Sequence, residues 1–274
     1  MLISAKNAVV SLGVSCQTAY QIRRHERLIA AALKDQDLAW QSSFFSNLIA
    51  PASAVVSLFS SGGAAEVLGE DIELSRRARW KAHGLFFWHD RFDRELLSSK
   101  YTYLLNKTIR LLRSVNNIVF IVSNTQNNLL ELSREIETMD PRIHEHDASE
   151  MVEVVTNFFG DKCRFLFVVN PDIGHVPHIL GKARGYVIEH DTGAWYGNTV
   201  AWQLILRQFL GYYNYFPDDR AQSRLDQITE RYETLSRQHM DLRSRYNALR
   251  EKLKTVGPLT RQSLPHGDLS KAAE

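Results

Sequence analysis

Residues 8–24, AVVSLGVSCQTAYQIRR, decide the fold expected for this chain. The first part, 8–14, is short, apolar and rich in β-branched side chains, which is typical of a buried strand. The second part, 17–24, holds good helix formers and no helix breaker. A turn of small residues, Gly13 to Ser15, therefore joins a strand to a helix, and Cys16 lies at the junction.

The same alternation continues along the chain. Further apolar runs predict strands over 84–88, 117–122, 164–169 and 185–189. Helical patterns are found over 17–33, 44–60, 93–113, 126–138, 149–159 and 199–213. Buried strands alternating with helices predict a three-layer α/β domain over residues 1–216, with a mainly parallel sheet flanked by helices.

Residues 217–256 have a different pattern. Apolar or aromatic side chains recur there at alternating spacings of three and four, at Leu225, Ile228, Tyr232, Leu235, Leu242, Tyr246, Leu249 and Leu253. This spacing predicts a C-terminal long helix or coiled coil, through which the chain would form a homo-oligomer or bind a partner protein. A long arm folded against its own domain is the alternative. Residues 257–274 begin with Gly-Pro and are polar, which predicts a disordered tail.

The composition is that of an ordinary globular protein. Of the 274 residues, 44% are hydrophobic and 23% are charged. The net charge of +2, from 33 basic and 31 acidic residues, gives no general case for a nucleic-acid partner. The only cysteines, Cys16 and Cys163, form no disulfide framework and indicate a reducing compartment. The apolar run 44–59 is too short and too interrupted for a membrane span. We expect a cytoplasmic protein without a membrane or nucleic-acid partner.

Cys16 is the leading candidate for chemistry. Free N–H groups and the positive end of a helix dipole favour a thiolate at a helix start. A small buried residue packed under the helix is the alternative. Histidine is the natural base, and His89 and His190 each follow a predicted strand and precede an aspartate, Asp90 or Asp191. Such a carboxylate could orient an imidazole, although neighbours on a strand point to opposite faces.

Ligands of parallel sheets gather at the carboxyl ends of the strands. The residues expected at that edge are Cys16, His89, Asp90, Ser123, Asn124, Asn170 and His190.

Metal and cofactor sites have little support. Histidines and aspartates cluster at 144–147 and in the loop 170–178, but neither group has a recognised ligand spacing. Gly62-Gly63 lacks the lysine and the spacing of a phosphate-binding loop. We therefore predict no metal and no cofactor. The basic cluster 76–81 is expected at a solvated strand edge, and the aromatic loop 191–202 is expected to close one end of the core or to bind a planar ligand.

Several motifs together resemble a known family. The run 11–16, followed by 19–24, resembles the opening motif of a bacterial family described as papain-like cysteine peptidases. Residues 88–92, Trp-His-Asp-Arg-Phe, are similar to the family's internal His-Asp-Phe motif, with Arg91 inserted. The segment 105–122 is similar to its helix-then-strand segment. The resemblance covers about residues 7–210.

The resemblance implies acyl transfer by a cysteine hydrolase on an unknown substrate. Cys16 would be the nucleophile and His89 the base, with Asp90 or Asp191 as an orienting carboxylate. Backbone N–H groups at Cys16 and Gln17 would stabilise an oxyanion.

Two departures from the family pattern leave alternatives open. The segment 38–43 lacks the aspartate of the family's Pro-Phe-Asp-Trp motif, and Ser123 replaces its arginine. One alternative is an inactive α/β module that binds partners or self-associates through its coiled coil, in surface-polysaccharide assembly. Another is an esterase-like hydrolase of flavodoxin-like fold with His190 as base.

Overall fold

The computed structural model divides the chain into two units, Met1–Phe216 and Pro217–Glu274. In the first unit it describes residues 6–35, 43–63, 71–74, 77–90, 93–136, 139–189 and 194–213. In the second it describes residues 231, 234, 238–239, 241–250 and 252.

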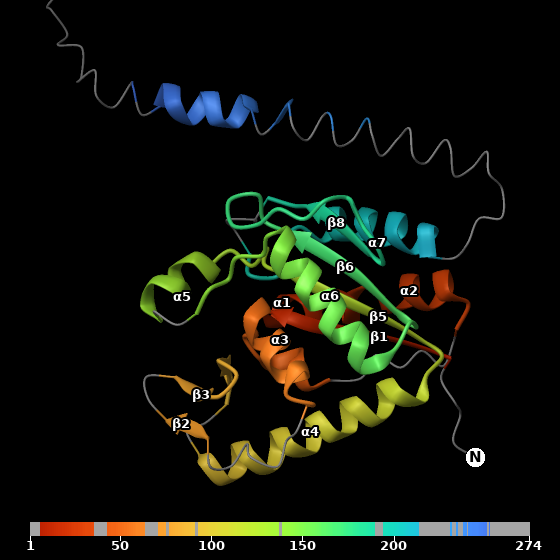
Figure 1. Ribbon diagram of the computed structural model, residues 1–274. Coiled ribbons are helices and arrows are strands. Elements are labelled where there is room, and N and C mark those ends of the chain that lie inside the picture. Colours follow the sequence, from red (N-terminus) through yellow and green to blue (C-terminus); the bar gives the residue numbers. More distant parts are fainter. Residues whose placement is uncertain are drawn as a thin grey trace, which may run out of the picture. The chain divides into compact units, whose positions relative to one another are not determined.

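Five strands of the described chain form the main sheet, in the order β1-β5-β6-β8-β7 (Figure 1). They are β1 (Asn7–Val14), β5 (Asn117–Ser123), β6 (Cys163–Val169), β7 (Ile179–Leu180) and β8 (Ala183–Val187). β1, β5, β6 and β8 pair in parallel, and β7 pairs with β8 in the antiparallel direction. The predicted α/β fold with a mainly parallel sheet is confirmed.

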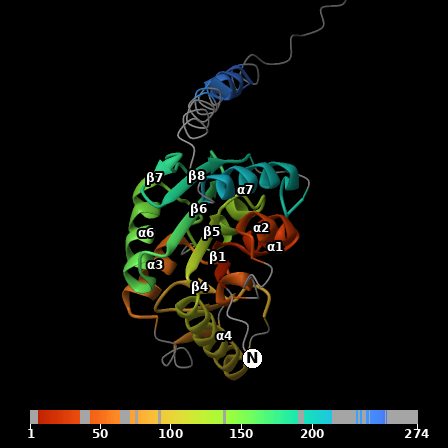
Figure 2. The same ribbon diagram turned by 90° about the vertical axis from the view of Figure 1, so that its right-hand side faces the viewer.

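Helices cover both faces of this sheet. The helices described in the first unit are α1 (Cys16–Arg24), α2 (Glu26–Leu33), α3 (Ala52–Ser60), α4 (Arg94–Ser114), α5 (Leu129–Glu135), α6 (Glu145–Phe159) and α7 (Thr199–Tyr213). One face buries Phe120 and Phe165 among side chains of α3, α4 and α6. The other buries Val119 and Leu166 against α2 and α7, including Trp202. Figure 2 shows α3 and α6 on one side of the sheet and α1, α2 and α7 on the other. Every residue of β1 is buried, as a strand covered on both faces requires.

A second, antiparallel sheet holds the strand predicted over 84–88. It contains β2 (Ile72–Leu74), β3 (Ala78–Trp80) and β4 (Leu85–Phe86). The prediction that 84–88 belongs to the parallel sheet is wrong, because Phe86 pairs with Arg79 and bridges to Ile49. An apolar run shows that a strand is buried but does not show which sheet it joins. The basic cluster contributes β3, where Arg79 forms an ion pair with Glu73 across the strands, at 2.7 Å.

Two predicted helices are interrupted. The helix over 17–33 is divided at His25 into α1 and α2. The helix over 44–60 is a 3₁₀ helix, η1 (Phe44–Asn47), followed by α3. Pro51 precedes α3 and disfavours a helical conformation for the residue before it, and Ile49 forms the bridge to Phe86.

The second unit contains a described helix over 241–250, in which Leu242, Tyr246 and Leu249 are all exposed. Much of the predicted 217–256 helix and the whole predicted tail 257–274 lie outside the described residues. The coiled coil and its self-association therefore stay predictions. None of the helices in the described ranges is long and apolar enough to cross a bilayer.

Candidate active site

The predicted strand–turn–helix junction is present at the end of β1. The strand ends at Val14, Ser15 is extended (φ −136°, ψ 170°), and Cys16 is the first residue of α1. Cys16 therefore lies at the carboxyl edge of the sheet. Because this residue is only half-buried, its thiol can be reached from solvent.

Gly13 allows another segment to approach this junction closely. Its φ is +124°, and a Cβ built on it would lie 2.5 Å from the carbonyl oxygen of Ala50. The N–H of Ala50 donates to the carbonyl of Val14 at 2.9 Å, and the hydroxyl of Thr18 donates to the carbonyl of Gly13 at 3.0 Å. The segment between η1 and α3 is therefore held against the end of β1, next to Cys16.

His89 lies beside the thiol. Its Nε2 is 3.5 Å from Sγ of Cys16, and its ring is otherwise exposed. His89 follows β4 of the antiparallel sheet, so it reaches the site from a different sheet than Cys16. The structure thus brings together the two residues that the resemblance joins.

Gln126 is a third polar residue at the thiol, and it was missed in the sequence. Its Oε1 is 3.8 Å from Sγ of Cys16, and its Nε2 donates to Oδ1 of Asn128 at 2.6 Å. Its position in the sequence could have revealed it, because Gln126 comes three residues after the end of β5, at the same edge of the sheet. The thiol therefore has two polar neighbours, the imidazole of His89 and the amide oxygen of Gln126.

Burial raises the pKa of the Cys16 thiol above its ordinary value, and the hydrogen bond from its own backbone N–H opposes this rise only in part. A helix start is expected to lower the pKa of this thiol, but desolvation raises the pKa by more. The thiol therefore holds its proton at neutral pH, and its sulfur could act as a nucleophile there only if a base accepted that proton.

This direction of the pKa shift predicts the pH profile of alkylation. A raised pKa lowers the thiolate fraction at neutral pH, so the rate of Cys16 carbamidomethylation by iodoacetamide should still be rising at pH 9. Peptide mass spectrometry on samples quenched between pH 6 and pH 10 measures this rate, with glutathione as the reference thiol. A plateau reached below pH 8 would show instead a stabilised thiolate.

The carboxylate of Asp90 faces α4 and not His89. It accepts hydrogen bonds from the hydroxyl of Tyr101, at 2.5 Å, and from Lys100. Burial, with the hydrogen bond to Asp90 and its charge, raises the pKa of Tyr101. Asp90 therefore fastens the loop that carries His89 to α4, in a different role from the predicted orientation of the imidazole.

An aromatic loop is attached to α1 beside the thiol. Nε2 of Gln17 donates to the carbonyl of Trp195 at 2.8 Å, and Nε2 of Gln21 donates to the carbonyl of Tyr196. The ring of Tyr20 meets that of Trp195 edge-on, with 5.1 Å between centroids. The predicted aromatic loop thus forms a wall of the site. His190 and Asp191 lie outside the described residues.

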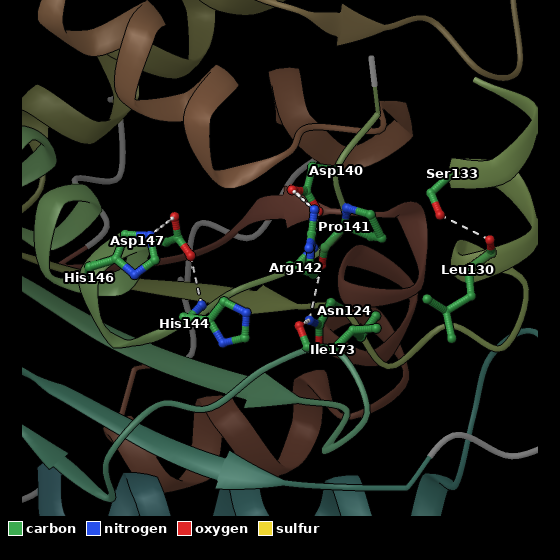
Figure 3. Close-up of polar contacts among 10 residues, drawn as sticks. All are labelled: Asn124, Leu130, Ser133, Asp140, Pro141, Arg142, His144, His146, Asp147 and Ile173. Atoms are coloured by element: carbon green, nitrogen blue, oxygen red, sulfur yellow. Dashed lines mark hydrogen bonds and ion pairs between the residues drawn. The ribbon is translucent and has the colours of Figure 1, made fainter. Parts of the chain in front are cut away.

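The other polar residues expected at the sheet edge hold loops together. Asn124 donates to the carbonyls of Pro141 and Ile173, at 3.0 and 3.1 Å (Figure 3), and accepts from the N–H of Asn170 at 2.8 Å. The hydroxyl of Ser123 lies 2.9 Å from that of Thr125. These contacts fix the segments that follow β5 and β6.

The histidine cluster at 144–147 begins α6. The carboxylate of Asp147 accepts from the backbone N–H of His144 at 2.7 Å and lies 3.2 Å from Nε2 of His146 (Figure 3). These contacts cap the helix. Among the residues that the structure describes, no three or more histidines, cysteines and carboxylates form a metal-binding group.

Two cavities meet at the Cys16–His89 pair. Their volumes are about 590 and 270 Å³, and Cys16, Asn47, His89 and Trp195 line both of them. A substrate carbonyl placed at the thiol would therefore have space on either side.

Comparison with models of protein families, with curated proteins and with solved structures finds no match to this chain. The function of this site therefore has to be inferred from its geometry.

Proposed function

We propose that the protein is a cysteine-dependent hydrolase that works by acyl transfer, with Cys16 as the nucleophile and His89 as the general base. The distance of 3.5 Å between Sγ and Nε2 is the observation that carries this proposal. A nucleophile and a base within reach of one another are the minimum requirement for covalent catalysis. The resemblance of 11–16 and 88–92 to papain-like cysteine peptidases supports the same two roles.

The first half of the reaction forms an acyl-enzyme. The thiol of Cys16 gives its proton to Nε2 of His89 while Sγ bonds to the carbonyl carbon of the substrate, and the carbonyl oxygen becomes an oxyanion. The bond to the leaving atom then breaks, and that atom takes the proton from His89. A thioester remains on Cys16.

Water completes the cycle. His89 accepts a proton from water as the water oxygen bonds to the acyl carbon, and the carbon–sulfur bond breaks. The sulfur then receives the proton from His89. The net reaction is the hydrolysis of one acyl bond by one water molecule, with the enzyme restored.

The oxyanion would form at the start of α1. The first N–H groups of a helix have no intrahelical acceptor and carry the positive end of its dipole. We assign oxyanion stabilisation to the N–H groups of Cys16 and Gln17, since that of Thr18 already donates to the carbonyl of Ser15 at 3.3 Å.

Labelling by an acyl probe tests the choice of base. His89→Ala should slow acylation of Cys16 by a biotin-tagged nitrophenyl ester by about 10²-fold or more, because the thiol loses the acceptor of its proton. His190→Ala and a control at the exposed His175 should label within about twofold of wild type. Labelling is read by peptide mass spectrometry at pH 7. Slow labelling of His190→Ala with normal labelling of His89→Ala would assign the base to His190 instead.

The strand order argues against the flavodoxin-like alternative. Flavodoxin-like sheets have the order 2-1-3-4-5, in which the first strand is internal. Among the described strands of this chain, β1 lies at the edge and pairs with β5. The esterase-like reading therefore depends on His190 alone, which the labelling experiment tests.

A further inference from the structure

The two cavities at the catalytic pair have different linings. Arg23 and Lys107 contribute positive charge to the larger cavity, together with the hydroxyl-bearing Ser43 and Ser46. The smaller cavity is lined by apolar side chains, Leu48, Ile49 and Trp88, and by the amides Gln126 and Asn128. The guanidinium of Arg77 lies 4.1 Å from the ring centroid of Trp88 and supports this wall.

Arg23 lies on the same face of α1 as the thiol. Cys16, Ala19, Tyr20 and Arg23 are spaced by three and four residues, and all four line the larger cavity. Seven residues of helix advance about 10 Å, and helical side chains lean toward the N-terminus. The guanidinium can therefore reach back along the cavity toward the thiol.

Lys107 comes from α4, a separate wall of the same cavity. The hydroxyl of Thr108 accepts from the N–H of Phe44 at 2.9 Å and so holds α4 against η1. Within the described part of the chain, neither Arg23 nor Lys107 forms an ion pair. Two cations that line one cavity attract an anion into it, and the guanidinium suits the flat, two-oxygen geometry of carboxylate or phosphate.

We propose that the substrate is an acyl donor with a short apolar acyl chain and an anionic leaving group, in which Arg23 and Lys107 hold the anion and the smaller cavity holds the acyl chain. This inference rests on the proposed hydrolase function. The acyl chain stays bound through both half-reactions, which suits the apolar cavity. The leaving group has to depart and be replaced by water, which suits the polar one.

Three esters with the same nitrophenol chromophore test this assignment. The first is 4-nitrophenyl hexanoate (hexanoyl 4-nitrophenol). The second is the hexanoate ester of the phenol group of 5-hydroxy-2-nitrobenzoate. The third is the 4-nitrophenyl monoester of adipic acid. The second carries a carboxylate on the leaving group and the third carries one on the acyl chain. We expect kcat/KM of the wild type to be about tenfold higher for the second ester than for the first, and lower for the third. Rates are corrected for the uncatalysed hydrolysis of each ester.

Charge-removing variants locate the anion site. Arg23→Gln and Lys107→Gln should each reduce the preference for the carboxylated leaving group, measured as the ratio of kcat/KM for the second ester to kcat/KM for the first, to about threefold or less. Arg24→Gln and Arg110→Gln remove neighbouring exposed charges that do not line this cavity, and they should keep the full preference. The preference should also shrink as salt rises from 0.05 to 0.5 M.

Free anions complete the test. Phenyl phosphate or benzoate should inhibit turnover of the neutral ester competitively, and the stronger inhibitor identifies the preferred anion. Inhibition by neither would overturn the assignment, as would equal preferences in Arg23→Gln and Arg24→Gln. Cys16-dependent turnover without any preference would remove this inference and leave the hydrolase proposal intact. Hydrolysis of all three esters at the rate of Cys16→Ala would remove the hydrolase proposal itself.

Discussion

Cys16→Ala is expected to reduce ester turnover by at least about 10⁴-fold, to a rate close to that of the uncatalysed reaction. Alanine has no atom that can bond to the acyl carbon, so the acyl-enzyme cannot form, and removal of a nucleophile in comparable hydrolases has effects of this size. Initial rates with hexanoyl 4-nitrophenol at pH 7 and pH 9 measure the loss. The higher pH is included because burial raises the pKa of this thiol, so turnover by the wild type should be faster at pH 9 than at pH 7.

Cys163→Ala is the matched control for the loss of a thiol. Cys163 is fully buried at the start of β6, and burial raises its pKa to about 11. It should therefore contribute nothing to turnover, and this variant should keep the rate of the wild type within about threefold if circular dichroism shows it folded. Turnover in Cys16→Ala at the wild-type rate would show that hydrolysis does not pass through Cys16.

Gly13→Ala should destabilise the first unit by about 3 kcal/mol. Two costs add, a backbone at φ +124° that alanine rarely adopts and a Cβ at 2.5 Å from the carbonyl oxygen of Ala50. The structure must move this backbone or separate Ala50 from β1. Urea unfolding followed by tryptophan fluorescence measures the free energy, and the melting temperature should fall by about 6–12 °C.

Gly62→Ala separates the two costs. Gly62 also has a positive φ, +87°, but a Cβ there would have nothing within 4 Å. Gly62→Ala should therefore lower the free energy of unfolding only by the conformational cost, about 1 kcal/mol. Equal losses in the two variants would mean that the approach of Ala50 to Gly13 does not constrain the fold.

Much of the parallel sheet could be predicted because its strands are covered on both faces. β1, β5 and β6 are almost continuous apolar runs, and the turn of small residues before Cys16 marks where strand becomes helix. Such runs are a local property of the sequence. The helix over 93–113 was equally clear, and Asp93 caps it by accepting from the N–H of Leu96 at 3.0 Å.

The placement of His89 could not be predicted from local pattern. β2 and β3 are strands of only three residues, too short to show a period, and β4 pairs with β3 and, through Phe86, with Ile49 much earlier in the chain. The link between Cys16 and His89 came from a resemblance to a family and not from residue spacing. Their distance is a tertiary property, set by how the antiparallel sheet lies against the end of β1.

Gln126 and Asp90 show the same limit for side chains. Gln126 follows β5 in a loop, and only the fold brings its amide to the thiol of a residue 110 positions away. Asp90 is adjacent to His89, which suggested an orienting carboxylate, but Lys100 and Tyr101 occupy it. The competition among partners is decided by packing against α4.

The two proposed catalytic residues follow strands of different sheets, because Cys16 follows β1 of the parallel sheet and His89 follows β4 of the antiparallel sheet. The position of His89 depends on the hydrogen bond from Tyr101 to Asp90, on the Ile49–Phe86 bridge and on the burial of the small sheet in the same hydrophobic core as β1. Under the proposed mechanism, a change that loosens these contacts would move His89 away from the thiol of Cys16 and slow turnover, even where the parallel sheet kept its native structure.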